Sequence, residues 1–322
     1  MKTKYKIQIA KTISFFLKLF YKKNQIHKRD GIKWSLDLNE GIDLSIFLFG
    51  TSEKKIRNLK YLFKSDSKLT IIDIGANIGS ISLPLAKIFD KSKIFAIEPT
   101  NYAFKKLNKN LNLNKNLKKN IFLNQLFLSK VKRPKEVWSS WNFTDNKDKH
   151  KQHLGSLHSI KKKSYISLTR FVNLKKIKKI DFIKLDVDGH ELDVLKSGEK
   201  ILKTKRPIIF IEIAPYLYPE FGYKCSELIN YIKKLKYSFY SEDLKRISNI
   251  NSYIKNITYG GSENFYLMKN YKNNLMIVCI IKDMHKCLWK NQHFNWVLLW
   301  LRIFTFSSFF LCFENLTMKL FL

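Results

Sequence analysis

Cysteine is scarce in this sequence, and its scarcity limits the kinds of protein to consider. The 322 residues hold four cysteines, and none of them belongs to a Cys-x-x-Cys pair. A long chain with so few cysteines carries no disulfide framework, so we expect a reducing, cytoplasmic setting. Cys279, His285 and Cys287 lie near one another in the sequence, but their spacing fits no zinc pattern. We therefore expect no metal site.

Acidic residues are scarce as well. The chain has 26 Asp and Glu against 60 Lys and Arg, which gives a formal net charge of +34. Such a charge favours anionic partners, namely nucleic acid, lipid head groups or an acidic polymer. The lysines are scattered, however, and they accompany many Asn and Ile residues, as in proteins from AT-rich genomes. A solvated basic surface without a specific partner is therefore an equal interpretation.

Neither end of the chain looks like the middle. Residues 1–23 are basic and apolar, but their apolar run, Thr12–Leu17, is too short for a signal peptide and no cleavage site follows. This segment is either a surface helix packed on the domain or a basic amphipathic helix lying on a membrane. The tail, residues 271–322, contains a stretch at 294–313 with Arg302 as its single charge, which is long enough to span a bilayer. The tail is either such a membrane segment or an extension without a function.

Between these ends, apolar runs alternate with segments of helical spacing. We expect a lead-in at residues 1–65 and one domain at residues 66–270. Near-continuous apolar strands alternating with helices predict an α/β fold, a doubly wound and mostly parallel sheet with helices on both faces. The expected strands are 69–73, 93–98, 121–126, 181–186, 207–213, 237–240 and 265–268, and the expected helices are 79–89, 102–113, 191–202 and 225–235. Residues 129–165 are polar and without a clear period, and we expect a long loop or an insertion there.

The first strand ends in a glycine-rich turn. Asp73, Gly75, Asn77 and Gly79 follow its apolar run, and the next residues have helical spacing. Glycine permits a tight turn or a positive φ, and asparagine tolerates the same geometry. Such a strand–turn–helix is where an open α/β sheet binds its ligand.

The second strand then ends in Glu98. An acidic residue at this distance from the turn hydrogen-bonds ribose hydroxyls in nucleotide-binding sheets, so the combination indicates a nucleoside ligand. The dinucleotide fingerprint GxGxxG is absent, and no Lys-Ser or Lys-Thr pair completes a phosphate-binding loop.

Further acids and a histidine follow the fourth strand. Asp186, Asp188 and His190 lie within five residues, at the carboxyl end of a strand that we expect beside the first one. Such groups are candidate general bases. The neighbouring Glu191 is equally well explained as a first-turn helix acid stabilised by the helix dipole. Glu212, on the apolar fifth strand, either caps a partner or contacts substrate, because an unpaired buried acid would be costly.

Together these segments resemble the FkbM family of class I methyltransferases. The resemblance rests on Ile-Ile-Asp-Ile-Gly-Ala-Asn-Ile-Gly at residues 71–79, Ala-Ile-Glu-Pro at 96–99, Asn110–Asn114, Asp-Phe-Ile-Lys-Leu-Asp-Val-Asp-Gly-His-Glu at 181–191 with Val194 and Leu195, and Pro-Ile-Ile-Phe-Ile-Glu-Ile at 207–213. It covers roughly residues 66–270. Asp188 stands where the family more often has Glu, which shortens the side chain and keeps its charge.

This resemblance implies a seven-stranded Rossmann-like sheet and S-adenosyl-L-methionine as methyl donor. Carried over by position, Asp73, Gly75, Asn77 and Gly79 would surround the methionine part of this cofactor. Glu98 would contact its ribose and Asn124 its adenine. The implied acceptor is a hydroxyl group of a sugar, polysaccharide or natural product.

We therefore expect an O-methyltransferase that acts on a small-molecule or glycan hydroxyl, with Asp186, Asp188 or His190 removing the proton. The high charge and apolar ends favour work near a membrane. One alternative is a nucleic-acid methyltransferase, although no Asn/Asp-Pro-Pro-Tyr segment occurs. Another is a membrane-tethered binding protein that keeps the fold without catalysis.

Overall fold

The structure is a computed structural model. It describes residues 12–17, 25–51, 54–130, 134–141, 155–160 and 165–269. The expected membrane segment 294–313, the rest of the tail and the Cys279–Cys287 group lie outside the described residues. The described residues, from 12 to 269, belong to one compact unit.

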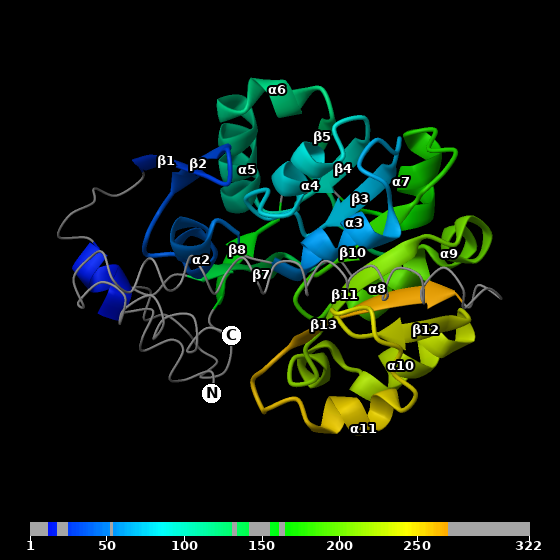
Figure 1. The fold of residues 1–322 in the computed structure, drawn as a ribbon. Coiled ribbons are helices and arrows are strands. Elements are labelled where there is room, and N and C mark those ends of the chain that lie inside the picture. The colour runs from blue at the N-terminus through cyan, green and yellow to red at the C-terminus, as the bar shows by residue number, and fades with distance from the viewer. Residues whose placement is uncertain are drawn as a thin grey trace, which may run out of the picture. The chain divides into compact units, whose positions relative to one another are not determined.

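A seven-stranded sheet is the centre of this unit (Figure 1). Its order is β12-β13-β11-β10-β3-β4-β5. The strands are β3 (Thr70–Ile74), β4 (Lys93–Ile97), β5 (Ile121–Asn124), β10 (Phe182–Leu185), β11 (Ile208–Ile213), β12 (Tyr237–Tyr240) and β13 (Glu263–Lys269). Neighbouring strands run parallel except β13, which is antiparallel to both β11 and β12. The predicted doubly wound α/β fold is therefore confirmed.

Helices cover both faces of the sheet (Figure 1). They are α4 (Ser82–Ile88), α5 (Asn101–Leu113), α6 (Lys115–Lys118), α7 (Leu168–Leu174), α8 (Glu191–Ser197), α9 (Glu199–Lys205), α10 (Cys225–Lys234) and α11 (Ile250–Lys255). On β3, Ile72 and Ile74 pack in one apolar cluster with Phe171 of α7, Leu195 of α8 and Ile229 of α10. Because side chains alternate along a strand, the residues between them face α4 and α5. The apolar strands are thus buried on both sides, which explains their continuous hydrophobic runs.

The order in which the chain adds strands to the sheet reverses between β3 and β10. From β3 the chain proceeds to β4 and β5, and it then returns to β10 on the other side of β3. The carboxyl ends of β3 and β10 therefore meet at a topological switch point, where open α/β sheets bind ligands. The predicted adjacency of the first and fourth strands is confirmed, with Asp73 level with Lys184 across the pair.

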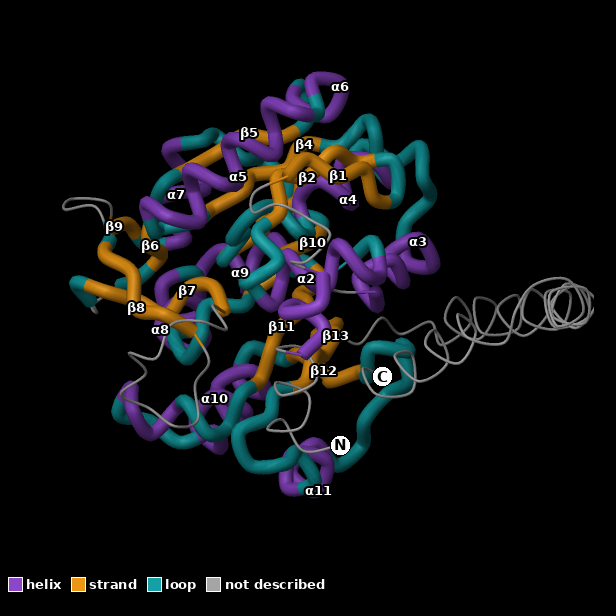
Figure 2. The backbone as a smooth tube through the Cα atoms, turned by 90° about the vertical axis from the view of Figure 1, so that its left-hand side faces the viewer, coloured by secondary structure: helices purple, strands orange, loops and turns teal. Residues whose placement is uncertain are grey.

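The prediction of a plain loop at 129–165 was wrong, because the region is an insertion with strands of its own. β7 (Glu136–Trp141) and β8 (Gly155–Ser159) lie inside this region, and β6 (Phe127–Leu128) and β9 (Tyr165–Ile166) lie at its two ends. β7 pairs antiparallel with β8, and β6 pairs with β9 (Figure 2). Phe127, Val137 and Ile160 bury a small core of their own. A local pattern cannot reveal such strands, because each is stabilised by a partner distant in the sequence.

Two predicted helices have different bounds. The helix expected at 191–202 is two helices, α8 and α9, separated at Gly198, where a Cβ would overlap the side chain of Leu168. The helix expected at 79–89 begins at Ser82, so Pro84 falls in its first turn. Proline is tolerated there because the first N–H groups of a helix have no intrahelical partner.

The lead-in is folded onto the sheet domain. It contains β1 (Gln25–Arg29), β2 (Ile32–Leu36), α2 (Gly41–Phe49), η1 (Lys54–Asn58) and α3 (Leu59–Leu62), and η2 (Tyr218–Phe221) follows β11. Asn110 of α5 and Asn114, which caps the end of α5, hold β2, because Asn110 accepts from the Ser35 N–H and Asn114 accepts from the Lys33 N–H. Trp34, between them, is fully buried. Among the described helices, none has both the length and the apolar character to cross a bilayer.

Candidate functional site

The turn between β3 and α4 has the strained backbone that its sequence predicts. Gly75, Asn77 and Gly79 all have positive φ angles, of 78°, 47° and 90°. A Cβ on Gly75 would overlap the carbonyl oxygen of Asp186, so only glycine fits there. This glycine turn therefore lies in backbone contact with the end of β10.

Asp73 is fully buried below the turn. Its Oδ2 accepts a hydrogen bond from Ser82 Oγ at 2.6 Å, and its Oδ1 lies 3.9 Å from the ammonium of Lys184. In this structure the carboxylate thus ties β3 to the start of α4 and to β10. Asp73 lies next to the glycine turn, and the contacts described here join it to the protein's own groups.

Glu98, at the end of β4, also makes its contacts inside the protein. Oε1 accepts from the N–H and the hydroxyl of Thr100, at 2.9 and 2.6 Å, and Oε2 accepts from the Asn77 N–H at 3.0 Å. Burial raises the pKa of this carboxyl, and the hydrogen bonds from Thr100 and Asn77 oppose the shift. Oε2 retains a lone pair, because a carboxylate oxygen accepts two hydrogen bonds. Glu98 therefore holds the glycine turn and keeps one acceptor position on Oε2.

The two asparagines differ. Asn77 Oδ1 is buried and has no hydrogen-bond partner in the described part of the chain. A buried acceptor of this kind is a candidate ligand contact, since leaving it unpaired costs roughly 1–3 kcal/mol. Asn124 instead donates its amide to the carbonyl of Phe122, at 2.8 Å, within its own strand.

Lys184 on β10 connects the glycine turn with the acids. Its ammonium donates to the Gly75 carbonyl at 2.8 Å and lies 3.0 Å from Asp186 Oδ2. Burial favours the neutral amine, but Asp186 and then Asp73 outweigh it, and the pKa of Lys184 is raised. The side chain is 8 % exposed. The sequence analysis assigned no role to this residue.

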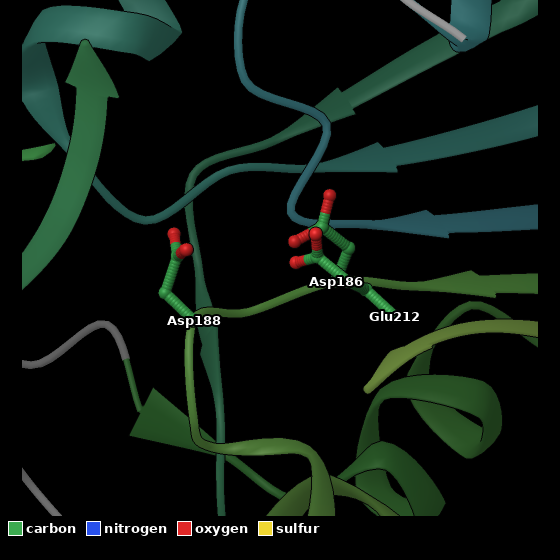
Figure 3. A group of neighbouring side chains, drawn as sticks. All are labelled: Asp186, Asp188 and Glu212. Atoms are coloured by element: carbon green, nitrogen blue, oxygen red, sulfur yellow. The ribbon is translucent and has the colours of Figure 1, made fainter. Parts of the chain in front are cut away.

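Three carboxylates meet at the ends of β10 and β11, and we call them the acid cluster: Asp186, Asp188 and Glu212 (Figure 3). One oxygen from each lies within 4.8 Å of the others. In Figure 3 the carboxylates of Asp186 and Glu212 lie side by side at the strand ends, and Asp188 stands on the following turn. Burial, Asp186 and Asp188 together raise the pKa of Glu212 well above its usual range. The Ser262 hydroxyl donates to Glu212 at 2.6 Å.

This arrangement has two chemical uses. A carboxylate with a raised pKa can accept a proton near neutral pH. Three carboxylate oxygens at this spacing are also of the type that hard cations such as Mg²⁺ or Ca²⁺ bind. The cluster was only partly visible in the sequence, because Glu212 joins it through the register of β10 and β11, two residues beyond the paired Lys184 and Phe210.

His190 and Glu191 lie behind the cluster. The His190 ring packs between Phe127 and Phe221, at centroid distances of 5.1 and 4.3 Å, and the residue is 3 % exposed. Its imidazole is outside the acid cluster. Glu191 Oε1 accepts from the N–H groups of Val187 and Gly189, at 3.1 and 3.3 Å, and burial raises its pKa to about 8. Glu191 therefore shapes the turn that carries Asp188.

Comparison with known protein families gives one match. A family model described as the methyltransferase FkbM domain matches residues 73–239, which is more than half of the chain. A search of curated proteins finds no match.

Solved structures with a similar fold include methyltransferase FkbM from Methylobacillus flagellatus KT, with a TM-score of 0.38 and 14 % identity over 62 % of this chain and 43 % of that chain. They also include TYW2 from M. jannaschii in complex with AdoMet, with a TM-score of 0.37 and 16 % identity over 77 % of this chain and 86 % of that chain. The human methyltransferase 10 domain containing protein has a TM-score of 0.42 and 13 % identity over 84 % of this chain and 99 % of that chain. The chain spans less than half the length of the first of these structures. At such scores none of the three carries an argument about activity or substrate.

Proposed function

The chain belongs to the FkbM methyltransferase family, and on that premise we propose that it is an S-adenosyl-L-methionine-dependent O-methyltransferase acting on a hydroxyl of a sugar, polysaccharide or glycolipid. The observation that carries the proposal is the contact between the glycine turn and the acid cluster. Gly75 lies against the Asp186 backbone, so a ligand seated on the turn has carboxylates as its neighbours.

The turn supports the cofactor half of the proposal. Asn77 Oδ1 is a buried acceptor without a protein donor, and Glu98 Oε2 has a lone pair available. An amino group and a ribose hydroxyl are the donors that would satisfy them. When bound, this cofactor supplies an electrophilic methyl group, so the protein's task is to align the acceptor.

The acid cluster supports the hydroxyl half. A hydroxyl oxygen that gains a methyl group must lose its proton, and we assign that proton to Asp186 or Asp188 of the acid cluster. His190 is buried between two phenylalanine rings, so we assign it to packing behind the turn. The cluster also favours a neutral, polyhydroxylated acceptor over nucleic acid, because negatively charged side chains repel a phosphate backbone.

The test combines binding and turnover. Calorimetry with S-adenosylhomocysteine should show binding, and at a hundred times its Kd this ligand should add about 2.7 kcal/mol to the free energy of unfolding. Tritiated methyl groups from S-adenosylmethionine should then enter an extracted polysaccharide fraction and leave total RNA unlabelled. Absence of binding would remove the cofactor assignment. Label in RNA supports the nucleic-acid alternative, and binding without transfer to either fraction supports the inactive binding protein.

We further propose that the N-terminal segment contacts an anionic membrane surface. Phe15 and Phe16, in the helical residues 12–17, are 62 % and 55 % exposed, and many lysines flank them in the sequence. Aromatic residues beside lysines are typical of interfacial segments. Co-sedimentation should show binding to phosphatidylglycerol vesicles and a weaker binding to phosphatidylcholine. Replacing both phenylalanines with serine should reduce the bound fraction, and an unchanged fraction would contradict the proposal.

A further inference from the structure

Lys184 is a buried cation on the central strand β10, and it touches two separate parts of the site. It lies level with Asp73 in the parallel pairing of β10 and β3, on the same face of the sheet. Its ammonium is within 4 Å of three oxygen atoms, those of the Gly75 carbonyl, the Asp186 carboxylate and the Asp73 carboxylate. The ammonium is at hydrogen-bond distance from the Gly75 carbonyl, at 2.8 Å, and from Asp186 Oδ2, at 3.0 Å, whereas Asp73 Oδ1, at 3.9 Å, contributes charge alone.

The three residues around the ammonium belong to different parts of the candidate site. Gly75 belongs to the glycine turn, Asp186 belongs to the acid cluster, and Asp73 joins β3 to α4. Gly75 and Lys184 are 109 residues apart in the sequence. One side chain therefore links the proposed cofactor turn with the proposed proton acceptor.

We propose that Lys184 is a positioning residue that holds the glycine turn and Asp186 at a fixed separation. This inference rests on the proposed function, in which the turn carries the methyl donor and Asp186 faces the acceptor hydroxyl. A methyl transfer in line needs the two reactants aligned, and a small displacement lowers the rate steeply. Lys184 acts through Gly75 and Asp186 and does not itself exchange a proton with the substrate.

Packing alone does not call for a lysine here. Phe182, two residues earlier on the same face of β10, is fully buried and apolar. Replacing a buried ion pair with apolar residues is often neutral for stability. Lys184 differs in having two partners: it donates a hydrogen bond to the Gly75 carbonyl, and its charge pairs with Asp186. Substitutions can remove the charge and the hydrogen bond separately.

The experiment compares Lys184→Met and Lys184→Gln with a control, Lys203→Met. Lys203 pairs with Glu199 on the surface of α9, so the control removes a lysine charge far from β10. The readouts are the Kd for S-adenosylhomocysteine and the kcat and KM of methyl transfer. Lys184→Met should raise the Kd by at least about tenfold, the usual effect of losing a hydrogen bond to a charged group. The control should stay within about twofold of the wild type.

Lys184→Gln separates the two roles. Its amide retains an N–H for the Gly75 carbonyl but carries no charge for Asp186. We expect a Kd within about threefold of the wild type together with a kcat that remains about tenfold or more below it. A merely structural role would instead lower the melting temperature of both variants and reduce ligand affinity and kcat in parallel, and that result would overturn the proposal.

Two further measurements keep the test decisive. If Lys184→Met does not fold, Lys184→Met combined with Asp73→Asn removes the carboxylate left without its cation and should restore the fold. Hydrogen exchange at the Gly75 and Ala76 amides should be faster in the Lys184 variants than in Lys203→Met. This readout needs no ligand, so it still decides the role of Lys184 if the wild type fails to bind S-adenosylhomocysteine. Unchanged exchange with unchanged Kd and kcat would overturn the inference.

Discussion

Two glycines with nearly the same backbone angle have different surroundings. Gly75 has a φ of 78° and Gly222 a φ of 76°. A Cβ on Gly75 would overlap the Asp186 carbonyl oxygen, whereas nothing lies within 4 Å of a Cβ on Gly222. An alanine at either position would be strained by the positive φ, and only at position 75 would its Cβ also collide with backbone.

We therefore predict that Gly75→Ala is far more harmful than Gly222→Ala. The Gly222 variant should lose about 1–2 kcal/mol of unfolding free energy, the cost of a left-handed alanine. The Gly75 variant should lose more, because the β3–α4 turn must move away from β10, and its affinity for S-adenosylhomocysteine should fall. Urea unfolding and calorimetry measure both. Equal losses in the two variants would contradict the close approach of the turns.

Glu191 should make stability depend on pH. Burial raises its pKa from 4.5 to about 8, so between these values the folded protein holds a proton that the unfolded chain has released. Its contribution to stability is therefore complete below pH 4.5 and is lost as pH rises through 8. Glu191→Gln keeps an acceptor for the Val187 and Gly189 N–H groups without ionising.

The Glu191→Gln variant should remove roughly 2–4 kcal/mol of the decline in unfolding free energy between pH 5 and pH 9. Urea titrations across this range measure the difference. Glu199→Gln is the matched control at the start of α9, because the hydrogen bond from Lys203 lowers the pKa of that carboxyl. A wild type and a Glu191 variant with the same pH dependence would show that this carboxyl does not hold the proton.

At the scale of elements, two helices begin with the same kind of cap. The Thr100 side chain accepts from the Ala103 N–H at the start of α5, and the Ser167 side chain accepts from the Arg170 N–H at the start of α7. Thr100 differs in also donating to Glu98, at 2.6 Å. One cap is therefore linked to the candidate site and the other is not.

Thr100→Ala and Ser167→Ala should each cost about 1 kcal/mol of unfolding free energy, the usual value of an N-cap. Only Thr100→Ala should also weaken S-adenosylhomocysteine binding, because Glu98 loses a hydrogen bond that orients it. Thermal unfolding and calorimetry on the two variants provide the comparison. An equal Kd in both would show that Glu98 does not need Thr100 to face the ligand.

The elements differ in how well their sequences predicted them. β3, β4, β10 and β11 have continuous apolar runs because both of their faces are buried, and such runs are visible without a partner. The β7–β8 pair has no such run, since it lies outside the central sheet and Val137 is its buried apolar side chain among those described. Its pairing depends on the meeting of two distant segments, which no local period records.

At the scale of the whole molecule, the lead-in is attached to α5 by hydrogen bonds and by a buried aromatic side chain. Asn110 and Asn114 hold the β2 backbone, and Trp34 is fully buried. Each large apolar side chain removed from such a position costs about 1.5–3 kcal/mol. Several such losses approach the whole stability of a domain, about 5–15 kcal/mol.

A chain that begins at residue 66 should therefore fail to fold, whereas one that begins at residue 25 should fold and bind S-adenosylhomocysteine. Near-UV circular dichroism and calorimetry on the two chains measure this. A folded, ligand-binding protein beginning at residue 66 would contradict the prediction and would support residues 66–270 as an independent domain.

The sequence by itself determined the fold class and the places of the glycine turn and the acids. Those features obey local rules, since a buried strand must be apolar and a positive φ needs glycine or asparagine. Tertiary structure alone decided what these residues touch. Glu98 turns toward Thr100 and Asn77, Lys184 meets Gly75, and Glu212 joins the acid cluster. These contacts follow from the register of strands that are far apart in the chain, and the composition of each strand does not encode that register.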